Sequence, residues 1–282
     1  MTAGRIGAGT YGCSIAWTFA RSGAFERVYL VDVTKEYAEE GLAKLAAQAA
    51  GEHRDEILSR IVPGTGAVCA DCDCIVEAAV EDSALKSACL SKLSNEIVKN
   101  PDCLFATTTS TLSVTKLGKD LRHPLIGMHF FTPVPEREAV ELVLGLCTDV
   151  QTLEKAKAVL EKLGKRGVVV SESPGNLVNR VLFPMINEAV TVLAEGLSDT
   201  EDIDAALRLS YGLPEGPLEL ADEIGLDNCL AVLSAIHRET GREQFRPHPL
   251  LRKLVRGGRC GRKAGIGFYD YRNGDKRALS VR

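Results

Sequence analysis

One histidine and one glutamate stand in stretches of the sequence that are otherwise apolar. His129 lies near the end of the run PLIGMHFF, and Glu141 interrupts the alternating stretch AVELVLG twelve residues later. Burying an unpaired carboxylate is costly, and a contact between the two side chains would remove that cost. A carboxylate bound to one imidazole nitrogen raises the basicity of the other, which can then take a proton from an alcohol. The pair predicts a general base for dehydrogenation, with a purely structural histidine as the alternative.

Near the N-terminus, glycines follow the spacing of a dinucleotide-binding turn. Gly7, Gly9 and Gly12 form GAGTYG, in which glycines permit a tight turn and a close approach of the backbone to pyrophosphate. Asp32 ends the run VYLVD twenty residues after Gly12, where an acid can accept both ribose hydroxyls and favours NAD over NADP. The alternative is a turn without a ligand, because the first strand would be TAGRI, a poor strand by propensity. We expect NAD as the cofactor.

The segments around these residues alternate between strand and helix patterns. Short apolar runs bounded by turn residues are typical of buried parallel strands, and they occupy residues 28–33, 74–80, 103–107, 125–131 and 168–170. Helical patterns lie between them, at residues 12–22, 36–49, 84–98 and 152–163. This alternation predicts an α/β fold of the Rossmann type, with a doubly wound, mostly parallel sheet.

The pattern changes after residues 171–179, SESPGNLVN. Residues 182–197, 200–209 and 226–240 have helical patterns without comparable strands. Asp199 and its neighbours supply capping side chains before IDAALRL, and Gly212 follows that helix. We therefore expect an NAD-binding domain at residues 1–174 and an all-α C-terminal domain at residues 175–282.

Composition and charge limit the classes of function. The 282-residue chain has 34 Lys and Arg against 38 Asp and Glu, a formal net charge of −4 that predicts no nucleic-acid partner. No apolar run reaches about 18 residues, and the N-terminus has no leader pattern, so we expect no membrane association. Nine scattered cysteines favour a reducing, cytoplasmic location. Cys69, Cys72 and Cys74 lack a fourth zinc ligand, and we expect no metal.

Several longer motifs occur in an order that resembles the 3-hydroxyacyl-CoA dehydrogenase family. They are IVEAAVEDSALK, residues 110–113, GMHFFTPVP, AVELV, SPGNLVNRVLFPMINEA, EGLSDTEDID, GLPEGPLELADEIGLD and GRKAGIGFYDY. The resemblance covers essentially the whole chain, and bacterial 3-hydroxybutyryl-CoA dehydrogenases are the most similar in length. It implies an NAD-dependent oxidoreductase that interconverts (S)-3-hydroxyacyl-CoA, with 3-hydroxybutyryl-CoA as the expected substrate, and 3-oxoacyl-CoA. It also implies a homodimer, with a second domain that serves substrate binding and dimerisation.

The resemblance assigns catalytic roles to four residues. His129 matches the family's catalytic base, and Glu141 matches the carboxylate that orients it. Ser110 and Asn179 match residues that hydrogen-bond the 3-oxygen of the substrate and help to align the reactants. For Asn179 the alternative is a helix cap.

The resemblance also adds three residues to the cofactor site formed by the glycines and Asp32. Glu81, Lys86 and Lys263 fall on positions that contact the cofactor in the family. The alternative for Glu81 and Lys86 is a solvated face at the start of a helix, and for Lys263 it is an exposed turn in GRKAG.

Two departures from the family pattern leave other functions open. Thr108 and Thr132 stand where the family usually has Asn, so each keeps a hydroxyl and loses an amide. The segment between Asp32 and residue 77 is shorter than the family's helical arm over the CoA nucleotide. One alternative is therefore a dehydrogenase of a hydroxy acid without CoA, and another is an NAD-binding protein that does not turn over substrate.

Overall fold

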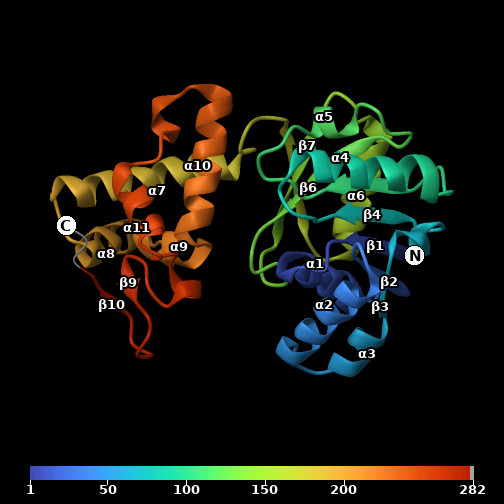
Figure 1. The fold of residues 1–282 in the computed structure, drawn as a ribbon, viewed down its shortest axis with the longest axis horizontal. Coiled ribbons are helices and arrows are strands. Elements are labelled where there is room, and N and C mark those ends of the chain that lie inside the picture. The colour runs from blue at the N-terminus through green and yellow to red at the C-terminus, as the bar shows by residue number, and fades with distance from the viewer. Residues whose placement is uncertain (280–282) are drawn as a thin grey trace. The chain divides into compact units, whose positions relative to one another are not determined.

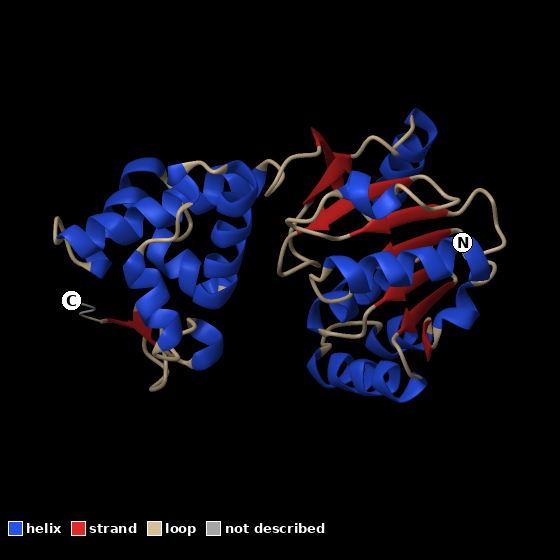
Figure 2. Cartoon of the chain, turned by 45° about the horizontal axis from the view of Figure 1, so that its top comes forward, coloured by secondary structure: helices blue, strands red, loops and turns tan. Residues whose placement is uncertain are grey.

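The computed structural model describes residues 1–279 and divides the chain into two compact units (Figure 1). The first unit is Met1–Asn176, and the second begins at Leu177. Residues 280–282, the last of the expected second domain, lie outside the described residues. The large sheet belongs to the first unit, whereas the second is built mainly from helices (Figure 2).

The first unit is organised around one sheet of eight strands. These are β1 (Thr2–Ile6), β2 (Arg27–Val31), β3 (Ile61–Gly64), β4 (Cys74–Glu77), β5 (Leu104–Thr107), β6 (Leu125–Phe130), β7 (Ala139–Leu144) and β8 (Arg166–Ser171). Their order is β3-β2-β1-β4-β5-β6-β7-β8. Neighbours are parallel, apart from β6 and β7, which are antiparallel. The strand order reverses beside β1, where open α/β sheets bind their ligands. The predicted doubly wound, mostly parallel sheet is confirmed.

Helices cover both faces of this sheet because its strands are apolar on both faces. One apolar cluster contains Leu30 and Val76 with side chains of α1 (Thr10–Arg21) and α6 (Val150–Lys162). The adjacent residues Val31 and Ile75 pack in a second cluster, with α4 (Ser83–Lys92), α5 (Val114–Gly118) and the π-helical turn η2 (Leu93–Ile97). Successive strand residues point to opposite faces, so a doubly covered strand is a continuous apolar run. The remaining helical segments are α2 (Lys35–Gln48), α3 (Arg54–Ser59) and the 3-10 turn η1 (Gly66–Cys69).

Strand β1 forms although its composition is unfavourable. It lies between β2 and β4 and is hydrogen-bonded to both. Arg5 is fully buried there, its guanidinium 3.2 Å from the centroid of the Phe19 ring, and burial lowers the pKa of Arg5 to about 10. Gly4 leaves room for the Cys69 thiol, which a Cβ would approach to 2.8 Å. The central position in the sheet therefore outweighs the low strand propensity of TAGRI.

The second unit packs five helices around its own core. They are α7 (Val178–Glu195), α8 (Thr200–Tyr211), α9 (Pro217–Ile224), α10 (Leu226–Thr240) and α11 (Pro249–Arg256), with short turns η3 (Glu243–Phe245) and η4 (Arg262–Ala264). Asp199 caps α8 through the N–H of Asp202, and Gly212 ends that helix with φ of 67°. A small hairpin, β9 (Tyr269–Asp270) with β10 (Arg277–Ala278), completes the unit. None of the helices in the described part of the chain is long and apolar enough to cross a membrane.

All nine cysteines are free thiols. Cys69, Cys72 and Cys74 are fully buried and behave as small apolar residues of the first unit. Across residues 1–279, no group of three or more His, Cys, Asp or Glu side chains is arranged to hold a metal ion.

Candidate active site

His129 and Glu141 face each other on neighbouring strands. The antiparallel register of β6 and β7 places the two residues directly opposite. Nδ1 of His129 lies 2.6 Å from Oε2 of Glu141, and the residues are only 6% and 1% exposed. An ionised carboxylate can only accept a hydrogen bond, so we assign the proton to Nδ1 and the lone pair to Nε2. This is the contact that the two interruptions in the apolar runs predicted.

Ser110 completes a line of three polar side chains. It lies in the loop that follows β5, and its Oγ is 3.1 Å from Nε2 of His129. With Nδ1 donating to Glu141, the Ser110 hydroxyl donates to Nε2. The Phe131 ring and the imidazole pack in an edge-to-face arrangement, with the centroids 4.8 Å apart. In this arrangement, Nε2 of His129 can accept a proton from the hydroxyl of a bound molecule, and Ser110 can hydrogen-bond the oxygen that loses the proton.

Two of the three glycines in the first loop are required by close backbone contacts. Gly7 has φ of 102°, and a Cβ there would lie 2.6 Å from the carbonyl oxygen of Ala78. A Cβ on Gly12 would collide with the carbonyl oxygen of Gly7. A Cβ on Gly9 would meet no atom of residues 1–279 within 4 Å. Gly7 and Gly12 therefore allow the tight turn of the loop, and the missing side chain of Gly9 leaves the space next to the loop open.

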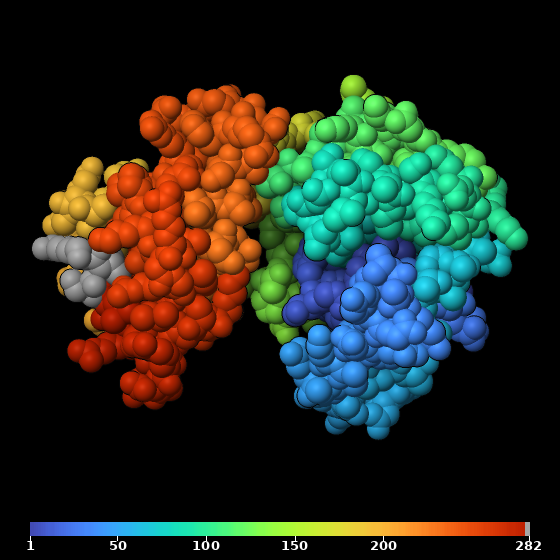
Figure 3. Space-filling view, in the orientation of Figure 1, coloured from blue at the N-terminus to red at the C-terminus, as the bar shows by residue number. Residues whose placement is uncertain are grey.

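That open space lies at the N-terminus of α1 and beside Asp32. Gly9 is the N-cap of α1, and no side chain of the described residues caps the helix, so its first N–H groups remain available to phosphate oxygens. The Asp32 carboxylate accepts hydrogen bonds from the N–H of Ala8, at 2.7 Å, and of Val33, at 2.8 Å. Figure 3 shows the dark blue N-terminal segment at the bottom of a hollow between the blue and teal segments. These residues fit a dinucleotide.

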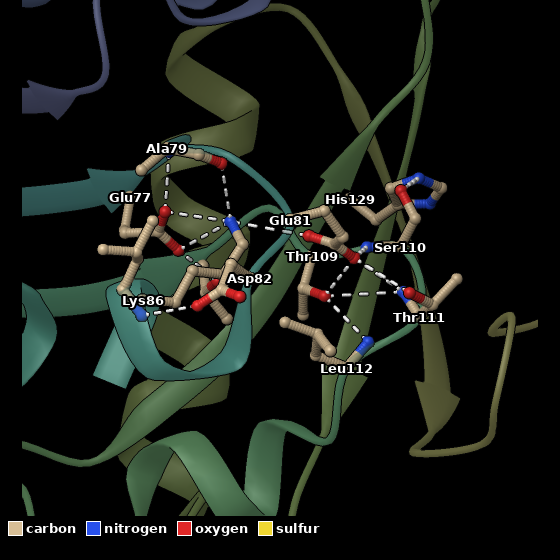
Figure 4. A network of polar contacts seen from close by, with 12 residues as sticks. Glu77, Ala79, Glu81, Asp82, Lys86, Thr109, Ser110, Thr111, Leu112 and His129 are labelled. Carbon is tan, nitrogen blue, oxygen red and sulfur yellow. Dashed lines mark hydrogen bonds and ion pairs between the residues drawn. The ribbon is translucent and has the colours of Figure 1, made fainter. Parts of the chain in front are cut away.

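Lys86 and Glu81 belong to a polar network beside Ser110 (Figure 4). The Lys86 ammonium is 1% exposed and donates to both oxygens of Glu77, at 2.9 and 3.1 Å, and to the carbonyl of Ala79, at 3.0 Å. A solvated face is therefore the wrong interpretation for Lys86. Glu81 is partly exposed, and its Oε1 accepts the N–H of Ser110 at 2.9 Å.

Asn179 and Lys263 lie in the second unit. Asn179 is buried inside α7, whose N-cap is Leu177, so the helix-cap alternative for Asn179 is wrong. Lys263 is exposed on η4, where its Nζ lies 2.7 Å from the Asp227 carboxylate. Of the four predicted catalytic residues, Ser110, His129 and Glu141 are joined into one group by hydrogen-bond contacts.

Two residues of the site were missed in the sequence. Glu77 ends the apolar run CIVE, and the argument that singled out Glu141 would have found it, because both are carboxylates in a buried strand. Tyr11 donates its hydroxyl hydrogen to the carbonyl of Phe130, at 2.9 Å, and so ties the glycine loop to β6 next to His129. No sequence pattern signals Tyr11, because its partner is a distant backbone atom.

The two threonines that replace family asparagines have different surroundings. Thr108 is buried, and its N–H donates to the carbonyl of Glu77 at 2.9 Å. Thr132 is exposed.

Comparisons with known proteins connect this geometry to a family. Residues 2–173 match the NAD-binding domain of 3-hydroxyacyl-CoA dehydrogenase, and residues 175–271 match its C-terminal domain. The chain belongs to the 3-hydroxyacyl-CoA dehydrogenase family. It is an NAD-dependent oxidoreductase of this family, as the motifs predicted.

Relatives and solved structures agree over nearly the full length. A 3-hydroxybutyryl-CoA dehydrogenase of Bradyrhizobium diazoefficiens is 42% identical over 95% of this chain and 94% of its own length. One from Clostridioides difficile is 40% identical, over 94% and 98%. The crystal structure of (S)-3-hydroxybutyryl-CoA dehydrogenase from Ralstonia eutropha has a TM-score of 0.86 and 38% identity, and it covers 96% of this chain and 98% of its own.

Proposed function

We propose that the chain interconverts (S)-3-hydroxybutyryl-CoA and acetoacetyl-CoA with NAD, and that His129 is the general base. The observation that carries this proposal is the line of Ser110, His129 and Glu141, in which a buried carboxylate holds the imidazole and leaves Nε2 facing a hydroxyl. The names of the full-length relatives support the four-carbon substrate.

The side chains act on the 3-hydroxyl as follows. Nε2 of His129 takes the hydroxyl proton, and the Glu141 carboxylate stabilises the imidazolium that forms. Ser110 donates a hydrogen bond to the oxygen as its charge develops, and we assign the same role to Asn179. NAD, when bound, supplies the acceptor for the hydride that leaves C3. No covalent bond between protein and substrate is needed.

The cofactor site is proposed from the glycine loop and the residues around it. Gly7, Gly9 and Gly12 shape the loop for the pyrophosphate, and Asp32 accepts the ribose hydroxyls. We propose Glu81, Lys86 and Lys263 as cofactor-site residues. The ammonium of Lys86 already donates to Glu77 and to the carbonyl of Ala79, so Lys86 would affect cofactor binding by holding the loop that contains Ala79.

We also propose that the second unit binds substrate and forms a homodimer in the cytoplasm. Apolar side chains exposed on α7 and α8, Val181, Leu209 and Tyr211, support a dimer contact. The stretches 189–197 and 229–236 contribute less to it, because most of their apolar side chains pack in the core of the unit. The free cysteines support the reducing location. Mass measurement in solution tests the dimer.

The decisive assay is NADH consumption with acetoacetyl-CoA, run beside acetoacetate and with NADPH in place of NADH. Turnover that needs both CoA and NADH supports the proposal, whereas activity on free acetoacetate would favour the hydroxy-acid alternative. His129→Ala and Glu141→Gln should lower kcat far more than they weaken NADH binding, because both side chains work in the transition state. NADH binding without turnover of either substrate would point to a non-catalytic role.

A further inference from the structure

Glu81 holds the loop that carries Ser110. A single carboxylate oxygen, Oε1, accepts the hydroxyls of Thr109 and Thr111, at 2.6 and 3.1 Å, and the N–H groups of Ser110 and Thr111, at 2.9 and 3.0 Å. Glu81 itself lies on the loop between β4 and α4. Figure 4 shows its carboxylate directed at residues 109–111. Two loops that are far apart in the sequence are thus joined at one oxygen atom.

The other side of Glu81 faces a buried ion pair. Its Oε2 lies 3.6 Å from the Lys86 ammonium, which is bound to Glu77. Glu77 is 0% exposed and also accepts the hydroxyl of Thr107, at 2.6 Å, and the N–H of Ala79, at 2.7 Å. These contacts connect the ends of β4 and β5 with the start of α4. Glu81 therefore lies between the buried Glu77–Lys86 ion pair and the loop that carries Ser110.

Two contacts set the position of Ser110. Its backbone N–H is fixed by Glu81, and its Oγ is 3.1 Å from Nε2 of His129. A displacement of about 1 Å in such a group can cost roughly a hundredfold in rate. We propose that Glu81 is a positioning residue, which places the Ser110 hydroxyl against His129 through the backbone of residues 109–111 and is itself anchored by the Glu77–Lys86 pair.

This inference rests on the proposed catalytic role of Ser110. It assigns different roles to the two carboxylate oxygens of Glu81. Oε1 is occupied by four donors of the loop, so a contact with the cofactor would fall to Oε2. Glutamine at this position keeps one acceptor oxygen for the loop and removes the charge, whereas alanine removes both. The two variants therefore separate positioning from cofactor binding.

The test compares Glu81→Ala and Glu81→Gln with wild type and with Glu161→Ala, which alters an exposed glutamate on α6. In Glu81→Ala, kcat should fall by roughly ten- to a hundredfold, whereas any weakening of NADH binding through the lost charge should be similar in Glu81→Ala and Glu81→Gln. Glu81→Gln should recover most of kcat. Equal loss of kcat in both variants, or a loss confined to the Kd for NADH, would overturn the proposal.

Two further measurements make the result independent of a general loss of structure or of the choice of substrate. Amide hydrogen exchange of residues 108–112 should be fast in Glu81→Ala and near the wild-type rate in Glu81→Gln, whether or not the enzyme accepts acetoacetyl-CoA. In the Ser110→Ala background, Glu81→Ala should lower kcat little further, because no hydroxyl remains to be placed. The positioning role would be contradicted if the losses of kcat from Ser110→Ala and Glu81→Ala multiplied in this double-mutant cycle, or if amide exchange were unchanged in Glu81→Ala.

Discussion

Replacing Lys86 by methionine removes a buried charge while it keeps much of the aliphatic bulk. The ammonium contacts both oxygens of Glu77 and the carbonyl of Ala79, and all three contacts vanish in Lys86→Met. Among residues 1–279, the Glu77 carboxylate, which is 0% exposed, then keeps only the Thr107 hydroxyl and the Ala79 N–H as hydrogen-bond donors. Leaving such a charge uncompensated costs about 3–5 kcal/mol of the free energy of unfolding.

Urea unfolding followed by the fluorescence of Trp17 measures this cost. Trp17 is the only tryptophan of the chain and lies in the core of the first unit, so it reports on the unit that contains the ion pair. The double variant Glu77→Gln with Lys86→Met should be more stable than Lys86→Met, because no unpaired charge remains. As a matched control, Lys155→Met breaks the exposed ion pair with Asp102 and should cost at most about 1 kcal/mol. A cost in Lys86→Met no larger than in this control, or a double variant that loses the sum of both single effects, would refute the reasoning.

Three other outcomes follow from the structure. Gly12→Ala should weaken NADH binding by roughly tenfold or more, measured by fluorescence titration, because the added Cβ collides with the carbonyl of Gly7 and opens the loop. Asp32→Ala should reduce the preference for NADH over NADPH in kcat/KM, and an unchanged preference would remove Asp32 from the ribose site. Burial raises the pKa of Asp222 to about 6, from about 3.9 in the unfolded chain. The stabilisation that protonated Asp222 gives the second unit, up to about 3 kcal/mol, is fully present below a pH of about 4 and is lost as the pH rises through about 6. Urea unfolding followed by circular dichroism should show this decline in wild type and a flatter profile in Asp222→Asn; parallel profiles would contradict it.

Local patterns predicted most of the sheet and the helices. The apolar run at residues 125–131 corresponds to β6, in which every residue is buried, because a strand covered on both faces needs apolar residues at every position. The run at residues 168–170 corresponds to β8, which lies at the edge of the sheet and is only partly buried. Strand β3, with the sequence IVPG, was not predicted, since proline and glycine disfavour strands. It forms at the edge of the sheet, where a missing N–H is tolerated and β2 supplies the pairing.

By itself, the sequence determined which chemical groups are present and which family they represent: the glycine spacing with Asp32, His129, Glu141, and the ordered motifs that match both domains. The tertiary structure alone decided how these groups meet. The antiparallel register of β6 and β7 places Glu141 opposite His129, and the β4–β5 neighbourhood brings Glu81 to the loop of Ser110. Such contacts depend on strand order and register across the sheet, and a local pattern of residues contains neither.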